Sequence, residues 1–160
     1  MQEEIKATLY LFSLLFYTPT PNSLEEARRI ASSVGYRALE ELLDTVSYED
    51  LLREYTRAFH GGPRAGACPP YESFYREGLI YGDTSVAVAK LLRERGYELA
   101  IEGELADHIA VELELASLTL DREIIRRLKE WVPELRKCLE TRSQLYANLA
   151  GKLEELLEQL

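Results

Sequence analysis

The sequence contains little of what disulfide-rich, metal-binding or nucleotide-binding proteins require. Its 160 residues include two histidines and two cysteines, and Cys68 and Cys138 stand far apart and outside any CxxC pair. We therefore expect no disulfide framework, and a reducing cytoplasm fits. The HExxH and ExxH patterns of metal sites, phosphate-binding loops, GxGxxG and GxSxG are all absent.

Long hydrophobic runs are missing as well. No apolar stretch reaches the roughly 18 residues of a membrane span. The N-terminal segment MQEEIKATLYLFSLLFY places Glu3 and Glu4 where a signal peptide has positive charge, and no small-residue cleavage site follows it. We expect a cytoplasmic protein with no stable membrane insertion.

Basic residues are also fewer than acidic ones: the chain has 19 Lys and Arg and 28 Asp and Glu, for a net charge of −9. Nucleic-acid binding is disfavoured because it requires clustered basic residues. An acidic surface would attract a cationic peptide, although it could serve solubility alone. Asn and Gln are scarce, five residues in all, which weakly indicates a thermophilic source.

Helical periodicity dominates the chain, and alternation with a period of two is sustained nowhere. The pattern predicts one all-α domain over 1–160, a compact bundle of about eight to ten helices. Ser23 and Glu26 form a capping-box pattern, Asp121 can cap a later helix, and Pro133 should kink that helix or start a new one. The expected helices cover approximately 5–16, 23–34, 36–46, 48–59, 71–77, 84–95, 103–118 and 122–132, and a leucine stripe continues from 135 to 160.

One break interrupts this pattern, the segment HGGPRAGACPP at 60–70. It holds three of the nine glycines and three of the six prolines, so neither a helix nor a central strand can cross it. We expect a hinge-like loop that is among the most exposed and mobile parts of the chain. Two protomers could exchange helices there, so a monomer and a helix-exchanged dimer both remain open.

Three groups of residues could carry chemistry. Aromatic residues flank the loop and suit either a peptide groove or the core: Tyr55, Phe59, Tyr71, Phe74 and Tyr75. In a helix over 103–118, Glu104, His108 and Glu112 would share a face beside Asp107 and form a proton shuttle, a metal site, an anchor for a cation or a structural contact. Cys68 could be a loop thiol that pairs with His60 or His108, or an incidental cysteine.

Three motifs in order resemble the TorD/DmsD/NarJ family of redox-enzyme maturation chaperones. The first is the helix end at Tyr55, Phe59 and Gly61, the second is Pro69-Pro70-Tyr71-Glu72-Ser73, and the third is Glu104-Leu-Ala-Asp107-His108 followed by a hydrophobic run. The N-terminal apolar helix and Trp131-Val132-Pro133 fit as well, so the resemblance covers about 5–140. Glu72 before the serine, and Glu114-Leu115-Ala116 where methionine is often found, depart from the pattern, so the subfamily stays open.

The resemblance implies a cytoplasmic, all-α, non-enzymatic chaperone. Such proteins bind the catalytic subunit of a molybdopterin oxidoreductase, often at its twin-arginine signal peptide, and hold it until the cofactor is inserted. No cofactor is expected, although weak GTP binding is implied by the resemblance alone. The implied peptide-binding residues are Tyr55, Phe59, Pro69, Pro70, Tyr71, Glu72, Ser73, Glu104, Asp107 and His108.

The hypothesis that follows is that the Pro69–Ser73 segment and the Asp107–His108 helix lie side by side as one recognition surface. Asp107 would face a groove and await an arginine of the client, and His108 would titrate near physiological pH. The alternatives are a small metal- or thiol-dependent enzyme that uses His108 or Cys68, and a helical adaptor without a peptide groove.

Overall fold

The computed structural model describes all 160 residues and confirms the all-α fold. Nine α-helices and one short 3-10 turn are present, and β pairing is limited to a single bridge between Tyr71 and His108. None of the helices is both long and apolar enough to cross a membrane. The elements are α1 (Gln2–Leu15), α2 (Pro21–Ser33), α3 (Arg37–Thr45), α4 (Tyr48–Phe59), η1 (Pro63–Ala65), α5 (Glu72–Glu77), α6 (Asp83–Glu94), α7 (Ile109–Thr119), α8 (Arg122–Glu140) and α9 (Gln144–Glu158).

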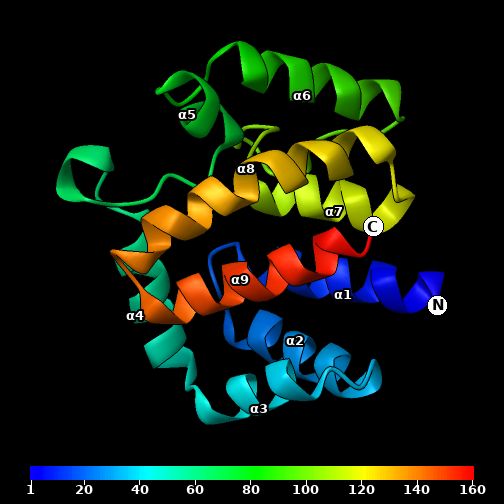
Figure 1. Cartoon of the computed structure of the whole chain (residues 1–160), viewed down its shortest axis with the longest axis vertical. Helices are drawn as coiled ribbons and strands as arrows, with labels where there is room; N and C mark the ends of the chain where they lie inside the picture. The colour runs from blue at the N-terminus through cyan, green and yellow to red at the C-terminus, as the bar shows by residue number, and fades with distance from the viewer.

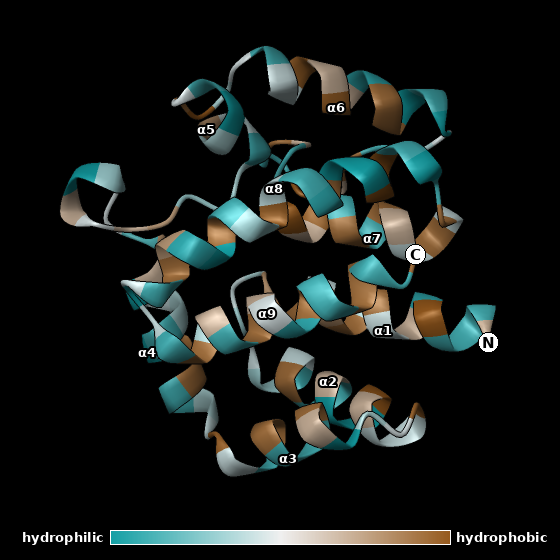
Figure 2. Ribbon diagram, in the orientation of Figure 1, coloured by the Kyte–Doolittle hydropathy of each residue, from teal (hydrophilic) through white to brown (hydrophobic).

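Helices α1, α7, α8 and α9 form the centre of the molecule, with a helix pair at each end (Figure 1). Helix α1 packs against α7 and α2, and α8 packs against α9. Helices α2 and α3 lie at one end, and α5 and α6 lie at the other. The side of α8 that faces the viewer in Figure 2 is largely hydrophilic, as expected for a helix that buries only one face.

One hydrophobic cluster of 36 buried residues joins these helices. The predicted deep burial of α1 is confirmed, because Leu9, Phe12 and Phe16 are fully buried. Tyr146 of α9 packs its ring against Phe16 and donates its hydroxyl hydrogen to the carbonyl of Leu15 at 3.0 Å. Each large apolar side chain buried in this way contributes about 1.5–3 kcal/mol.

Helix α2 begins earlier than the Ser23–Glu26 pattern predicts. The capping residue is Thr20, whose hydroxyl accepts a hydrogen bond from the Ser23 amide at 3.0 Å, while the Ser23 hydroxyl accepts one from the Thr20 amide at 2.9 Å. Pro21 occupies the first helical position, where its missing N–H costs nothing. The prediction placed the cap three residues too late because the proline was read only as the end of the preceding helix.

Helix α7 begins later than predicted, at Ile109 rather than near Gly103. His108 caps it, since its Nδ1 accepts a hydrogen bond from the Ala110 amide at 3.0 Å. Residues before His108 do not continue the helix because their backbone pairs with the start of α5: the Asp107 carbonyl accepts a hydrogen bond from the Glu72 amide at 3.1 Å. The prediction that Glu104, His108 and Glu112 share one helix face is therefore wrong.

The last quarter of the chain, from Arg122 onward, forms two helices and has no break at Pro133. Pro133 lies inside α8 and starts no new helix. Its missing N–H leaves the carbonyl of Lys129 without its helical donor, and Lys129 is exposed, so water can take that place. The leucine stripe is interrupted at Thr141, and Ser143 caps α9 by accepting from the Tyr146 amide at 3.3 Å.

The two cysteines form a disulfide, which the sequence analysis did not expect. Cys68 and Cys138 are separated by 70 residues, but the chain returns to place their Cα atoms 5.9 Å apart, within the range of a disulfide. The bond ties the end of the 60–70 loop to α8. Spacing along the chain carried no sign of this proximity.

The 60–70 loop is exposed in its first part only. Residues 60–66 are exposed, as predicted, but 67–70 are buried. The Cys68 amide donates to the Ala58 carbonyl at 2.7 Å and so returns the chain to the end of α4. The buried part leads directly into the Tyr71–Ser73 segment.

Candidate functional site

The predicted neighbours do meet: the segment Pro69–Ser73 lies against Asp107 and His108. The Glu72 amide donates to the Asp107 carbonyl at 3.1 Å, and the Ile109 amide donates to the Pro70 carbonyl at 2.8 Å. These two bonds form the single β bridge of the molecule. Two segments more than thirty residues apart are thus held in a fixed register at the N-termini of α5 and α7.

Asp107 does not face a groove, contrary to the expectation from sequence. Its side chain is fully buried, and its Oδ2 atom accepts a hydrogen bond from the Ser73 amide at 2.8 Å. Ser73 is in the first turn of α5, whose own preceding residue, Tyr71, makes no side-chain capping bond. Asp107 therefore caps α5 from another part of the chain, and its partner lies inside the protein.

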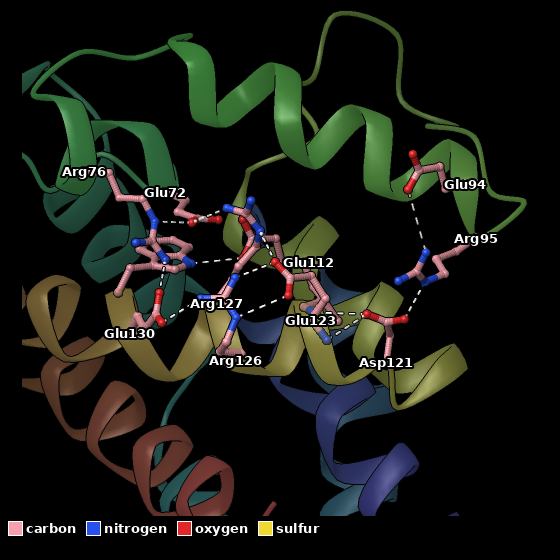
Figure 3. Close-up of polar contacts among 12 residues, drawn as sticks. Glu72, Arg76, Glu94, Arg95, Glu112, Asp121, Glu123, Arg126, Arg127 and Glu130 are labelled. Carbon is pink, nitrogen blue, oxygen red and sulfur yellow. Dashed lines mark hydrogen bonds and ion pairs between the residues drawn. The ribbon is translucent and has the colours of Figure 1, made fainter.

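A buried carboxyl cluster lies beneath this contact and consists of Glu72, Asp107 and Glu112. All three residues have an exposed fraction of 0%. Glu72 pairs with Arg127 at 2.9 Å and with Arg76, which lie on α8 and α5 (Figure 3).

Glu112 has a different partner, and its surroundings shift its pKa. Its Oε1 atom accepts a hydrogen bond from the Trp131 indole N–H at 3.0 Å. Burial, and secondly the neighbouring Glu72 carboxylate, raise the pKa of Glu112 well above its usual value. Both effects favour the neutral form of Glu112, which would have a hydrogen to share with Glu72 and would lower the negative charge of the cluster.

A second group, the carboxylate–tyrosine site, reaches the surface and consists of Tyr17, Tyr71, Glu104 and His108. Glu104 is partly exposed and accepts hydrogen bonds at Oε1 from the Tyr71 hydroxyl at 2.8 Å and from the Leu105 amide at 2.9 Å. The rings of Tyr17 and Tyr71 pack edge-to-face on His108, with centroids 5.2 and 5.1 Å away. No basic side chain lies within 4.0 Å of Glu104, so its charge is solvated and uncompensated.

The electrostatics of this site keep every group but Glu104 neutral. Burial lowers the pKa of His108 to about 4, against a weaker opposing effect of Glu104, so the prediction that His108 titrates near physiological pH is wrong. Burial and the hydrogen bond to Glu104 raise the pKa of Tyr71, and burial raises the pKa of Tyr55 to about 12. A single anionic carboxylate beside aromatic rings is an arrangement that binds a guanidinium group.

The remaining predicted site residues lie deeper. Tyr55 and Phe59 are buried, their rings pack against one another at a tilt of 51° with centroids 4.8 Å apart, and both also pack on Tyr146. Pro69 and Pro70 are buried in the segment that leads into Tyr71. These four residues support the site from below and do not line its surface.

Sequence reasoning missed Tyr17 as a site residue. It follows α1 directly and belongs to none of the three motifs. The only available signal was its position just before Thr18-Pro19-Thr20-Pro21, where the prolines end the first helix. Arg127 and Trp131 were likewise missed as partners of the buried carboxyl groups.

The residues of the enzyme alternative are placed differently from what it requires. The expected exposed thiol is wrong, because Cys68 is fully buried and its sulfur is bonded to Cys138. The structure contains no group of three or more His, Cys, Asp and Glu side chains arranged to hold a metal ion.

Comparisons with known proteins place the chain among maturation factors. Residues 28–151 match the family described as nitrate reductase delta subunit. The chain is also similar to a crystal structure of a protein from Archaeoglobus fulgidus that has been assigned to redox enzyme maturation. The two share 35% sequence identity with a TM-score of 0.86, over 96% of this chain and 93% of that one. No curated protein matches the chain.

Proposed function

The chain belongs to the nitrate reductase delta subunit family, and on that premise we propose that it is a cytoplasmic chaperone for the catalytic subunit of a molybdopterin oxidoreductase. It would bind the twin-arginine signal peptide of that subunit and hold the subunit until the cofactor is inserted and export can follow. The family is one of maturation factors and not of enzymes, and the similar Archaeoglobus fulgidus protein is assigned to redox enzyme maturation.

The uncompensated carboxylate of Glu104 is the observation that carries this proposal. A guanidinium group forms paired hydrogen bonds with a carboxylate and stacks on aromatic rings, and Tyr17 and Tyr71 supply rings close by. A twin-arginine peptide presents two such groups side by side. The net charge of −9 adds a general attraction for a cationic segment.

The buried residues have a positioning role in this proposal. Asp107 and Ser73 fix the segment that carries Tyr71, and the His108 ring separates Tyr17 from Tyr71. A site held by buried bonds loses less entropy when the peptide binds than a site on a mobile loop.

The disulfide is compatible with a cytoplasmic location in one class of organism. Disulfides are rare in the cytosol of mesophiles but common in intracellular proteins of hyperthermophiles. The scarcity of Asn and Gln, five residues in 160, agrees with a thermophilic source.

A peptide-binding experiment tests the proposal. The probe is a fluorescein-labelled synthetic peptide with two adjacent arginines followed by an apolar stretch of roughly ten leucine and alanine residues. Glu104→Gln should weaken binding by about tenfold or more, because hydrogen bonds to charged groups contribute about 1.5–3 kcal/mol. A peptide with two lysines should bind more weakly than the arginine peptide, since an ammonium group lacks the planar fork.

Glu102→Gln is the matched control. Glu102 is exposed and lies, like Glu104, in the connection between α6 and α7, and its substitution changes the net charge by the same amount as Glu104→Gln. If both variants weaken binding to the same extent, only overall charge matters and Glu104 is not the arginine site. If the unaltered protein fails to bind the arginine peptide, the proposed function is wrong.

A further inference from the structure

Helix α7 presents apolar side chains to solvent although its composition is that of a buried helix. Its sequence, IAVELELASLT, has two charged residues, and one of them, Glu112, is fully buried. A helix that is apolar on nearly all sides is normally enclosed. Yet Leu118 near its C-terminal end is 50% exposed, and Val111, about two helical turns earlier on the same face, is partly exposed.

Two hollows lie along this outward face and meet in the middle. The first, about 140 Å³, lies between α7 and the chain that follows α6, and its apolar lining includes Leu99, Ile101 and Leu118. The second, about 250 Å³, lies between α7 and the end of α1 and includes Leu14 and Tyr17.

The two hollows share Ile101, Val111 and Glu114 in their linings, so they lie next to each other along α7, and we call the pair the α7 groove. Each hollow is below the roughly 300 Å³ at which small-molecule pockets begin. The groove is therefore of a size for individual side chains of a peptide and not for a cofactor.

The groove continues from the carboxylate–tyrosine site and has a matching charge. Tyr17 lines the groove and also packs on His108, so the groove and the carboxylate–tyrosine site lie next to each other. The charged side chains that line the groove are Glu98 and Glu114, and no Lys or Arg is among them. An apolar channel with an acidic rim fits an apolar segment whose flanking residues are basic.

We propose that the α7 groove binds the apolar segment of the same client peptide whose arginines occupy the carboxylate–tyrosine site. This inference rests on the proposed function and assigns the second half of the peptide to a surface. Apolar side chains of the peptide enter the two hollows and cover Ile101 and Leu118. The burial of these side chains supplies affinity, whereas Glu104 supplies selection for arginine.

The chain contains a closely matched control for this proposal. Ile101 and Leu118 are 44% and 50% exposed, and Ile80 and Leu79, in the connection between α5 and α6, are 43% and 50% exposed. The double variant Ile101→Gln with Leu118→Gln alters the groove, and Ile80→Gln with Leu79→Gln makes the same chemical change elsewhere. Both should fold, since all four side chains are already largely in contact with water.

Binding is measured for two probes, the arginine peptide with its apolar stretch and a shortened peptide that ends after the arginines. The groove variant should bind the long peptide about tenfold more weakly or worse and the short peptide unchanged. The control variant should bind both peptides as the unaltered protein does. If the groove variant binds the long peptide as tightly as the unaltered protein does, the groove inference is wrong but the proposed function stands. The same holds if only the control variant loses affinity, which would place the apolar segment on the α5–α6 connection. Failure of the unaltered protein to bind either probe overturns the proposed function as well.

Discussion

The buried carboxyl cluster and the carboxylate–tyrosine site are built from the same two segments but have opposite properties. In the cluster, Glu72 and Asp107 are fully buried and their partners are an arginine of α8 and a backbone amide. In the site, Glu104 is partly exposed and its partners are a tyrosine hydroxyl and a backbone amide.

The difference separates residues that hold the segments together from a residue that is free to bind. A buried carboxylate without a donor would cost several kcal/mol, and within the cluster Glu72 and Asp107 have internal partners while burial raises the pKa of Glu112 and favours its neutral form. Glu104 remains solvated and has no such requirement. A motif that contains both kinds of acid is therefore not uniformly a recognition motif.

The largest expected effect concerns the disulfide that anchors the segment shared by both groups. Reduction of Cys68–Cys138 should lower the free energy of unfolding by about 4 kcal/mol, because the bond closes a loop of 70 residues. Denaturant unfolding with and without dithiothreitol measures this. A Cys68→Ser, Cys138→Ser double variant should show no further response to the reductant.

The next effect compares adjacent arginines of α8. Arg127→Met should cost about 3 kcal/mol, because it leaves buried Glu72 with Arg76 as its only basic partner. Arg126→Met should leave the melting temperature nearly unchanged, since Arg126 pairs with exposed Glu123 and Glu130. Thermal unfolding of both variants gives the comparison, and equal melting temperatures would mean that the cluster does not depend on Arg127.

The third effect is a dependence of stability on pH. His108 has a pKa of about 4 in the folded protein against an unperturbed value of 6.5, so the unfolded chain binds a proton first as the pH falls. Stability is fully present above pH 6.5 and is lost toward pH 4, by about 2 kcal/mol at pH 5. His108→Asn keeps a capping side chain for α7 and should abolish this loss. A loss of the same size in the variant would assign it to other groups.

The smallest expected effect on stability is that of Glu104→Gln. The amide oxygen can still accept from the Tyr71 hydroxyl, so the free energy of unfolding should change by less than about 1 kcal/mol. Chemical denaturation measures it alongside Arg127→Met. A large loss would place Glu104 with the buried cluster and remove the contrast between the two groups.

Local signals in the sequence were sufficient for most of the fold. Asp121 caps α8 as the pattern indicates, and the glycine and proline content of 60–70 marks the one long break. The three motifs also identified the family and the meeting of Pro69–Ser73 with Asp107–His108. These features depend on residues within one or two helical turns, or on motifs whose order is visible in the chain.

The start of α7 and the accessibility of the site residues could not be predicted from such local signals. The backbone on either side of His108 pairs with the segment before α5, Asp107 with Glu72 and Ile109 with Pro70, and this tertiary contact overrides the helical propensity of residues 103–108. The same contact buries Asp107 and lowers the pKa of His108 through loss of solvent. Glu104 and Asp107 are close together in sequence but differ in exposure, because Asp107 is part of this contact and Glu104 lies at its edge.

The amino-acid sequence by itself determined the all-α class, the approximate number of helices and the acidic, aromatic composition of the region around Tyr71 and Glu104. The tertiary structure alone decided that Cys68 meets Cys138, that Tyr17 joins the site, and which acids are solvated. The physical reason is range: periodicity and capping act over a few residues, whereas burial and the pairing of distant segments depend on how the whole chain packs.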